Sequence, residues 1–269
     1  MSFATDLALS LDPTLLAHKA GMIPDPWQAD ILRSDAQQIA LLCSRQSGKS
    51  TTTSFIALHR ALFHPASLIL LLAPALRQSQ ELFRKLKVAY SPISQTVPLV
   101  EESALRLEFA NESRIVCLPG SEKTIRGFSG ASLLIVDEAA RVKDALYQSI
   151  RPMLAVSKGK LILLSTPFGK RGFFHHEWDK GGTAWHRSKM TAYDCPRISP
   201  EWLEAERRSI GDWWFRQEYL CEFVDSVHSV FRYEDMQRAL DSTVAPLFPQ
   251  EQSRWNISNT RVLTPLPTL

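Results

Sequence analysis

The sequence predicts an α/β fold: a doubly wound, mostly parallel β-sheet flanked by helices, with a small helical annex. Short, continuous apolar runs recur along the chain, and such runs are typical of parallel strands that are covered on both faces. Amphipathic stretches alternate with these runs, which is the strand–helix order of doubly wound folds. A chain of 269 residues is long enough for one such domain with a small addition.

The predicted elements follow one another in this alternating order. The expected strands are residues 39–43, 67–73, 133–136, 161–164 and 184–190. The expected helices are a short one within residues 1–25, and then residues 26–32, 49–63, 75–90 and 144–154. An antiparallel hairpin is expected from residues 105–109 and 115–118. Residues 200–222 are consistent with two helices that are separated at Gly211.

These elements divide the chain into three parts. Residues 1–25 form an N-terminal segment, and residues 26–231 form the main domain. Within that domain, residues 184–231 are expected to be a helical, lid-like annex. Residues 232–269 are interpreted as a tail or the remnant of a linker, because they contain prolines and polar residues without hydrophobic periodicity.

Composition limits the class of protein. A net charge of +3 permits a nucleic-acid partner without requiring one. The N-terminus lacks the pattern of a secretion signal, and the longest apolar run, residues 68–73, is too short to span a bilayer. The cysteines are far apart, so we expect reduced thiols rather than a disulfide framework or a zinc site. They are Cys43, Cys117, Cys195 and Cys221.

The stretch from Ile39 to Thr51 has the organisation of a phosphate-binding loop: an apolar run, a short polar loop, and then a helix-compatible stretch. In such a loop, backbone N–H groups surround phosphate oxygens, a lysine adds positive charge, and a hydroxyl can ligate Mg²⁺. Cys43 stands where the usual pattern has its first glycine, and a surface Gly-Lys-Ser turn is the alternative. The residues expected to contact the nucleotide are Ser44, Gln46, Ser47, Gly48, Lys49, Ser50 and Thr51.

A second motif places two carboxylates directly after an apolar run. Asp137 and Glu138 follow residues 133–136, and α/β sheets bind ligands at the carboxyl ends of their strands. The first acid suits Mg²⁺, together with the Ser50 hydroxyl, and the second suits activation of an attacking water. The alternative is that the two acids cap the next helix.

A third motif ends the apolar run 161–164. Ser165 and Thr166 follow it, and their hydroxyls could hydrogen-bond either a γ-phosphate or the acid pair. An ordinary strand exit before Pro167 is an equally good interpretation.

The ordered set of motifs PWQ, CSRQSGKS, IRGFSG, LLIVDEAAR, LLSTPFGKRGFF and QEYLCEF resembles the ATPase domain of large terminase subunits, over about residues 20–231. These subunits are the DNA-packaging motors of tailed double-stranded DNA phages and prophages. The resemblance implies a RecA-like P-loop NTPase core of the ASCE class. It also implies ATP as substrate and Mg²⁺ as its metal, with Ser50 and Asp137 as the metal-binding residues.

The same resemblance implies residue roles. Lys49 matches the Walker A lysine, and Glu138 matches the catalytic acid of the Walker B pair. Arg45 corresponds to an arginine near the γ-phosphate, and Arg141 is a candidate arginine finger acting in trans. For Arg141, a solvated arginine at a helix start is the alternative. The expected catalytic residues are therefore Glu138, Lys49, Arg45 and Arg141.

Two further positions follow from the resemblance. Gln28 matches a Q-motif glutamine whose amide can pair with the adenine edge, and Ser165 and Thr166 match the coupling motif. Trp27 could pack near the base, although an ordinary indole against the core is the stronger interpretation.

The implied partners are double-stranded DNA, the portal and procapsid, and a small terminase subunit, with no membrane partner. A ring of identical subunits is expected only on the portal, and the expected location is the host bacterial cytoplasm. Two other functions remain open: a helicase-like DNA translocase, and a non-catalytic prophage remnant that binds nucleotide or DNA. An ATPase measurement with and without DNA would separate them.

Full-length large terminases continue with an RNase H-like nuclease domain, whereas few residues follow Phe231 here. Asp235, Asp241 and Glu251 sit on no apolar strand, so we interpret them as surface carboxylates. Nuclease activity is therefore not expected.

Two remaining groups of side chains have plain interpretations. His175 and His176 are expected to be a surface pair, because adjacent helical residues point apart and no further ligand accompanies them. Several basic residues either touch DNA phosphates or form a solvated rim, and the sequence favours neither. They are Arg151, Lys158, Lys160, Lys170 and Arg171.

Overall fold

The computed structural model describes residues 3–119 and 127–224, and these residues form one eight-stranded sheet in the order β3-β4-β5-β2-β6-β7-β1-β8. Six neighbouring strands, β5, β2, β6, β7, β1 and β8, run parallel to one another. At one edge of the sheet, β4 pairs antiparallel with β5, and β3 pairs antiparallel with β4. The strands are β1 (Gln38–Cys43), β2 (Leu68–Ala73), β3 (Leu99–Glu102), β4 (Arg106–Phe109), β5 (Arg114–Pro119), β6 (Leu133–Asp137), β7 (Lys160–Ser165) and β8 (Trp185–Met190). The predicted doubly wound, mostly parallel sheet is confirmed.

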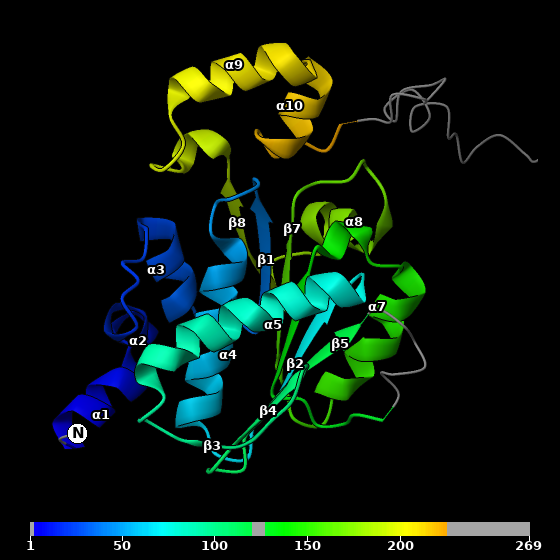
Figure 1. Cartoon of the computed structure of the whole chain (residues 1–269). Coiled ribbons are helices and arrows are strands. Elements are labelled where there is room, and N and C mark those ends of the chain that lie inside the picture. The colour runs from blue at the N-terminus through cyan, green and yellow to red at the C-terminus, as the bar shows by residue number, and fades with distance from the viewer. Residues whose placement is uncertain (1–2, 120–126, 225–269) are drawn as a thin grey trace, which may run out of the picture. The chain divides into compact units, whose positions relative to one another are not determined.

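Helices cover both faces of this sheet (Figure 1). One face packs against α1 (Phe3–Leu11), α2 (Pro13–Lys19), α3 (Pro26–Arg33), α4 (Lys49–Phe63) and α5 (Leu76–Tyr90). The other face packs against α7 (Asp144–Ile150) and α8 (Gly172–Lys180). Because each side of the sheet is covered, the central strands β1, β2, β6 and β7 are apolar at almost every position rather than at alternate ones.

Alternation within one strand explains how two cores arise. In β1, Ile39 and Leu41 contribute to the core under α4 and α5, whereas Ala40 and Leu42 contribute to the core under α7 and α8. Successive side chains of a strand point to opposite faces, so one apolar run supplies both layers. The P-loop strand is thereby buried on both sides and fixed in position.

The N-terminal segment contains two helices where the sequence analysis expected one. Asp12 caps the second helix, because its carboxylate accepts a hydrogen bond of 2.9 Å from the Thr14 backbone N–H. Pro13 occupies the first turn of α2, where a missing N–H costs nothing. Arg33 binds the same carboxylate at 2.7 Å and lowers the pKa of Asp12 to about 2. Pro13 therefore begins a second helix that the sequence analysis did not predict.

Two other expectations need correction. The predicted helix over residues 144–154 is divided: α7 ends at Ile150, and a short 3₁₀ helix, η3 (Arg151–Leu154), follows with Pro152 in its first turn. The predicted hairpin is present as β4 and β5, but β3 was missed. That strand is an edge strand with exposed Glu101 and Glu102, so it lacks the apolar pattern that marks the others.

The predicted annex begins later than residue 184. Strand β8 pairs in parallel with β1 and belongs to the main sheet. The lid, defined here as residues 192–224, contains α9 (Pro200–Ile210) and α10 (Asp212–Glu218), which are separated at Gly211 as predicted. It has a small core of its own around Leu203 and Phe215.

All four cysteines are buried free thiols, and burial raises the pKa of Cys43 to about 12. Among the described residues, no helix is long and apolar enough to cross a membrane. The predicted tail, residues 232–269, lies outside the described residues, as do Asp235, Asp241 and Glu251.

Candidate active site

The strand order brings the three predicted motifs together at one edge of the sheet. Strand β7 lies between β1 and β6 and is parallel to both. The carboxyl ends of parallel strands meet at the same edge, so the loop after β1, the acids after β6 and the hydroxyls after β7 converge there. The lid helices α9 and α10 lie beyond the same edge (Figure 1). We call this region the carboxyl-edge site.

The loop after β1 needs a glycine at position 48. Gly48 has φ +92°, a left-handed conformation, and a Cβ atom there would lie 2.6 Å from the Gln28 amide nitrogen. The left-handed backbone conformation therefore favours glycine, and a larger residue would also require the Gln28 side chain to shift. The Ser47 hydroxyl donates to the Ser44 carbonyl at 3.0 Å, which tightens the loop further. Gln46, with φ +58°, and Gly48 are both left-handed, and turns that contain left-handed residues can present backbone N–H groups to an anion.

Two contacts join this loop to the acid pair. The Ser50 hydroxyl lies 3.2 Å from a carboxylate oxygen of Asp137. The Lys49 ammonium lies 3.6 Å from a carboxylate oxygen of Glu138. Residues that are 87 and 89 positions apart in sequence thus form two adjacent pairs. The sequence prediction that these four side chains share one site is consistent with this placement.

Asp137 is buried to 9% exposure, and its surroundings disfavour its charge. Burial and the neighbouring Glu138 carboxylate raise the pKa of Asp137, while Lys49 and the Ser50 hydrogen bond oppose that shift. A buried carboxylate beside a hydroxyl oxygen is a donor set that suits a hard divalent cation. Ser50 and Asp137 therefore fit the predicted role of metal-binding residues.

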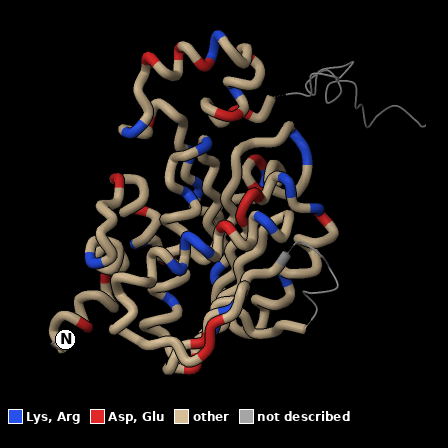
Figure 2. Tube along the Cα trace, in the orientation of Figure 1, with Lys and Arg blue, Asp and Glu red and all other residues tan. Residues whose placement is uncertain are grey.

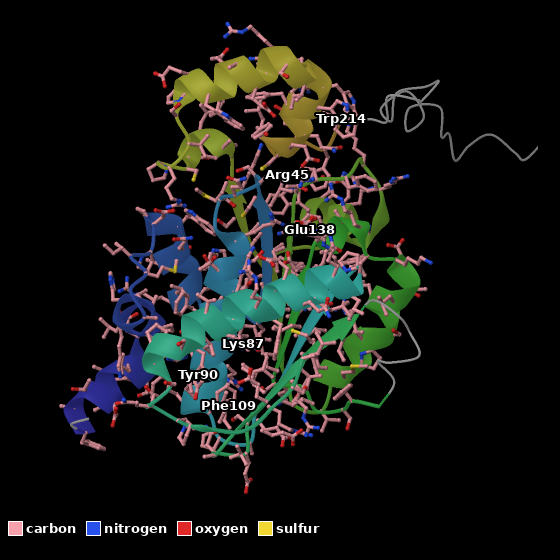
Figure 3. The ribbon with its side chains drawn as sticks, in the orientation of Figure 1. Arg45, Lys87, Tyr90, Phe109, Glu138 and Trp214 are labelled. Atoms are coloured by element: carbon pink, nitrogen blue, oxygen red, sulfur yellow. The ribbon has the colours of Figure 1, made fainter. Side chains whose placement is uncertain are left out.

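Glu138 has an unusual backbone conformation, with φ +49° and ψ +43°. A non-glycine residue in this left-handed region is strained, and such residues occur often at functional sites. Here the conformation ends β6 abruptly and begins the short 3₁₀ helix η2 (Ala139–Arg141). Glu138 and Arg45 lie at the end of the sheet that faces the lid (Figure 3).

Arg141 connects the three parts of the site. Its guanidinium donates to Glu138 at 2.9 Å and to the Thr166 hydroxyl at 3.0 Å, and it lies 3.4 Å from Glu218 in the lid. It also lies over the ring of Phe168, 4.9 Å from the ring centre. The alternative of a solvated arginine is therefore wrong, since the Arg141 side chain is 24% exposed and has three polar partners.

The hydroxyls of Ser165, the last residue of β7, and of Thr166 contact the segment that follows the acid pair. The Ser165 hydroxyl accepts a hydrogen bond of 3.2 Å from the Ala140 backbone N–H, just after Glu138. Thr166 binds Arg141 as described above. The two hydroxyls contact residues 140 and 141, and within the described part of the chain no hydrogen bond joins them to Asp137 or Glu138, so the predicted bond to the acid pair or to a γ-phosphate stays a prediction.

Glu218, on the last turn of α10, was missed by the sequence analysis. Its carboxylate is 2.5 Å from Arg45 Nε and 3.4 Å from Arg141, and its own carbonyl accepts from the Arg45 backbone N–H at 3.4 Å. The Glu218 side chain is only 10% exposed. The available signal was the motif QEYLCEF, which contains Glu218 but suggested no chemistry by itself.

A second lid residue, Arg197, was also missed. It donates to both carboxylate oxygens of Asp25, at 3.0 and 2.8 Å, and to the Ser47 carbonyl at 3.3 Å. Asp25 begins helix α3, and the Gln28 side-chain oxygen accepts from the Asp25 backbone N–H at 2.8 Å. Gln28 is thus a buried helix-capping residue whose amide nitrogen faces Gly48. The lid is anchored to the loop at two places, through Arg197 and through Glu218.

The other predicted residues are placed as follows. Trp27 packs against the core, which agrees with the stronger of its two interpretations. Thr51 is half-buried in the first turn of α4. His175 lies edge-on to Phe223 at 4.8 Å, and no cluster of three or more His, Cys, Asp or Glu residues suited to a metal is present in residues 3–119 and 127–224.

The predicted basic rim is not a single surface. Arg151 is paired with Glu177 at 3.1 Å, and Lys160 is half-buried with its ammonium donating to the Ser34 carbonyl at 2.5 Å. Arg171 lies over the Phe168 ring, 4.7 Å from its centre. Figure 2 shows lysines and arginines mixed with carboxylates around the carboxyl-edge site, whereas the carboxylates of β3 and β4 lie at the opposite end.

Comparisons with known proteins give a consistent picture. Residues 40–238 match the family described as "Terminase large subunit, T4likevirus-type, N-terminal". The large terminase subunit of Thermus phage G20c is 29% identical over 252 residues, an alignment that covers 80% of this chain and 52% of that protein. The chain therefore spans about half the length of the curated relatives that it matches.

Solved structures agree on the fold. The ATPase domain of the Thermus phage P74-26 large terminase superposes with a TM-score of 0.70 at 24% identity, covering 77% of this chain and 97% of that one. The large terminase of the thermophilic bacteriophage D6E in complex with ADP superposes with a TM-score of 0.60 at 17% identity, covering 80% of this chain and 53% of that one. The RecA-like prediction is confirmed at the level of fold.

Proposed function

The chain belongs to the terminase large-subunit family, and from that premise we propose that it is a Mg²⁺-dependent ATPase that powers the movement of double-stranded DNA into a procapsid. One observation carries the proposal: Lys49 and Ser50 of the loop lie against Glu138 and Asp137, respectively, at the carboxyl ends of two strands. The D6E terminase in complex with ADP and with ATP-γ-S supports nucleotide as the ligand.

The phosphates would bind in the nest formed by the loop. Backbone N–H groups around Gly48 and at the start of α4 would donate to phosphate oxygens. Lys49 would exchange its contact with Glu138 for the β- and γ-phosphates, because both accept the same ammonium. That exchange would free Glu138 at the moment when the substrate is in place.

Ser50 and Asp137 would hold Mg²⁺, which neutralises phosphate charge when it is bound. The raised pKa of Asp137 reflects a charge that lacks sufficient compensation in the free site. A cation bound between Ser50 and Asp137 would supply the missing positive charge.

Glu138 would act as the general base. Its carboxylate would accept a proton from a water molecule as the water oxygen attacks the γ-phosphorus and the bond to the β-phosphate oxygen breaks, giving ADP and phosphate. Arg141 binds this carboxylate at 2.9 Å and would have to release it for the base to work. The geometry thus favours a role for Arg141 on its own site, alongside the trans role that the resemblance implies.

The lid would couple ATP hydrolysis to the movement of DNA. Glu218 binds Arg45 from the loop and Arg141 from the acid segment, so any shift of either arginine toward phosphate changes the anchor of α10. The partners proposed for this motion are DNA, the portal and a small terminase subunit, in the host cytoplasm. A ring would form only on the portal.

The test is phosphate release by the purified chain with ATP and Mg²⁺, with and without duplex DNA. We expect slow, Mg²⁺-dependent turnover by a largely monomeric protein. No turnover at saturating ATP would overturn the enzyme assignment and leave the non-catalytic alternative. Strand separation of a forked duplex would instead support the helicase-like alternative.

A further inference from the structure

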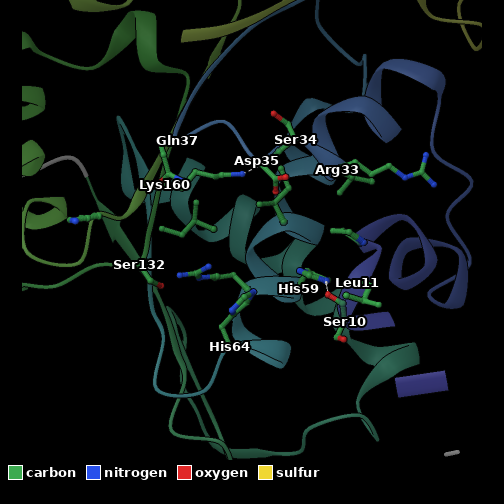
Figure 4. A pocket seen from close by; sticks show the side chains of 16 residues that line it. Ser10, Leu11, Arg33, Ser34, Asp35, Gln37, His59, His64, Ser132 and Lys160 are labelled. Atoms are coloured by element: carbon green, nitrogen blue, oxygen red, sulfur yellow. Dashed lines mark hydrogen bonds between the residues drawn. The ribbon is translucent and has the colours of Figure 1, made fainter. Parts of the chain in front are cut away.

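A cavity of about 430 Å³ opens at the other edge of the sheet, where β1, β6 and β7 begin. The end of α3, the helix α4 and the segment before β7 also line it. Its lining includes three cationic side chains: Arg60 from α4, Lys158, and Lys160 from the first position of β7. Figure 4 shows Lys160, His59, His64 and Asp35 around it. We call it the amino-edge cavity.

None of these three cations forms an ion pair with a carboxylate within residues 3–119 and 127–224, although the Asp35 charge opposes the lowering of the Lys160 pKa by burial. Arg33 also lines the cavity, but Asp12 already neutralises it at 2.7 Å. Asp35 is the one carboxylate in the lining. These three cations and one acid leave a net charge of about +2 at neutral pH, and of the three Lys160 already donates to the Ser34 carbonyl at 2.5 Å.

Arg60 shows most clearly that a partner is missing. Its Nε atom is buried and has no hydrogen-bond acceptor. Buried donors in proteins are almost always satisfied, and an exception calls for an explanation such as a bound ion. Burial lowers the pKa values of Arg60 and Lys160, and burial together with Arg60 lowers the pKa of His64. The protein therefore holds positive charge here at some cost in solvation.

We propose that the amino-edge cavity binds a phosphate dianion, either free or as the terminal phosphate of a nucleic acid. Phosphate oxygens can accept from the terminal nitrogens of the Arg60 guanidinium and from Lys158 and Lys160, which approach from different elements. A dianion matches the net charge of the lining, and the volume leaves room for an attached nucleoside or for water. This site is separate from the carboxyl-edge site and does not depend on the proposed function.

The two histidines provide a local readout. His59 Nε2 lies 3.1 Å from the carbonyl oxygens of Leu9 and Ser10, so this nitrogen carries the proton that is donated to them. A bound dianion would change the environment of the His59 and His64 rings, and their NMR signals would shift. His176, on α8, does not line the cavity and is the internal reference.

The experiment uses the full-length Lys49→Ala chain with isotope-labelled histidine, so that phosphate binding by the loop is weakened. Inorganic phosphate is titrated at constant ionic strength, with chloride as the control anion. Two duplexes, one with 5′-phosphate ends and one with hydroxyl ends, form the second arm. We expect saturable shifts of His59 and His64 with phosphate, with the phosphorylated duplex, or with both, and none with chloride. The arm that responds identifies the source of the phosphate.

Arg60→Gln is the test variant, and Arg84→Gln is the matched control, because Arg84 lies on the exposed face of α5 and is paired with Glu81. We expect Arg60→Gln to weaken phosphate binding at least about tenfold and Arg84→Gln to leave it unchanged. Without phosphate, Arg60→Gln should unfold at the same temperature as its parent or higher, because it removes an unpaired, partly buried cation. If it fails to fold, Lys160→Gln replaces it.

Two results would overturn the proposal. One is the absence of histidine shifts with phosphate and with both duplexes. The other is phosphate binding that persists unchanged in the folded Arg60→Gln and Lys160→Gln variants. Loss of ATP hydrolysis has no bearing on either result, so the two proposals fail separately.

Discussion

The two edges of the central sheet differ in how their charged side chains are paired: among the described residues, cations have acidic partners at one edge, whereas some lack them at the other. At the carboxyl-edge site, Lys49 contacts Glu138, and Arg141 contacts both Glu138 and Glu218. At the amino-edge cavity, Arg60 and Lys158 have no acidic partner in the described part of the chain. One end of the sheet is internally neutralised, and the other keeps an excess of positive charge.

This difference indicates two ways of preparing for an anion. Paired side chains are held in place before the substrate arrives, and the ligand must exchange partners with them. Unpaired side chains carry a solvation cost that the ligand relieves directly. Substitutions at the carboxyl edge should therefore change chemistry, and substitutions at the amino edge should change how stability depends on anions.

The largest effect is expected for Lys49→Ala. The variant removes the charge that the loop presents to the phosphates, so ATP turnover should fall by more than about 10³-fold while the far-UV circular dichroism spectrum stays the same. Lys87→Ala is the control, since Lys87 forms a surface pair with Glu102 at 2.8 Å and lies away from Arg45 and Glu138 in Figure 3. Unchanged turnover in a folded Lys49→Ala protein would remove the basis for the phosphate-loop assignment.

Glu138→Gln should separate binding from hydrolysis. The amide keeps the shape of the side chain and loses its basicity, so turnover should drop by about 10²–10³-fold while the dissociation constant for ATP changes little. Calorimetry of ATP binding and a phosphate-release assay measure the two quantities. Equal loss of binding and turnover would give Glu138 a metal-binding or structural role instead.

Glu218→Gln tests whether pairing across the lid matters for the chemistry. Without the carboxylate, Arg141 would lose one acceptor and bind Glu138 more fully, so kcat should fall on the order of tenfold with a smaller change in KM. Glu222→Gln is the matched control, because Glu222 pairs with Arg216 on the exposed side of the lid. Identical kinetics for the two variants would show that the lid anchor plays no part in turnover.

The smallest effect is expected for Asp137→Asn, in stability. Burial raises the pKa of Asp137, so the folded chain retains this proton more tightly than the unfolded chain. Folding is then favoured below the unfolded pKa, and that advantage is lost as pH rises through the folded pKa. At pH 8 the nucleotide-free variant should therefore be more stable than the parent, by about 1 kcal/mol, with a smaller gain at pH 5.

Thermal unfolding at the two pH values, without nucleotide or divalent cations, measures this difference. Asp212→Asn is the control, since Asp212 pairs with Arg207 at an exposed position. A loss of stability at pH 8 that is specific to Asp137→Asn would mean that the carboxylate stabilises the empty site, contrary to the burial argument.

The part of this fold that the sequence predicts is the part that depends on local pattern. Each buried strand is a continuous apolar run, and the phosphate loop and the acid pair each occupy consecutive residues. The edge strand β3 cannot be predicted in this way, because its side chains are half-buried or exposed and form no apolar run. Helix α2 cannot be predicted from the local pattern either, because a proline such as Pro13 suits a turn and the start of a helix equally well.

The missed site residues are those that depend on long-range placement. Glu218 and Arg45 are 173 positions apart, and Arg197 and Ser47 are 150 apart. Nothing in the local sequence of the lid indicates that these side chains reach the loop. The amino-edge cavity could not be predicted from the sequence either, because its lining residues come from distant segments. In the local sequence, Arg60 resembles any arginine at the end of an amphipathic helix.

The most direct test of the account is a crystal structure of the Glu138→Gln chain with ATP and Mg²⁺, in which hydrolysis is slow enough to trap the substrate. The account predicts the triphosphate in the loop of residues 44–51, Lys49 displaced from position 138 to the phosphates, and the metal ion at Ser50 and Asp137. A triphosphate bound elsewhere, or Lys49 still in contact with position 138 beside a bound nucleotide, would contradict it.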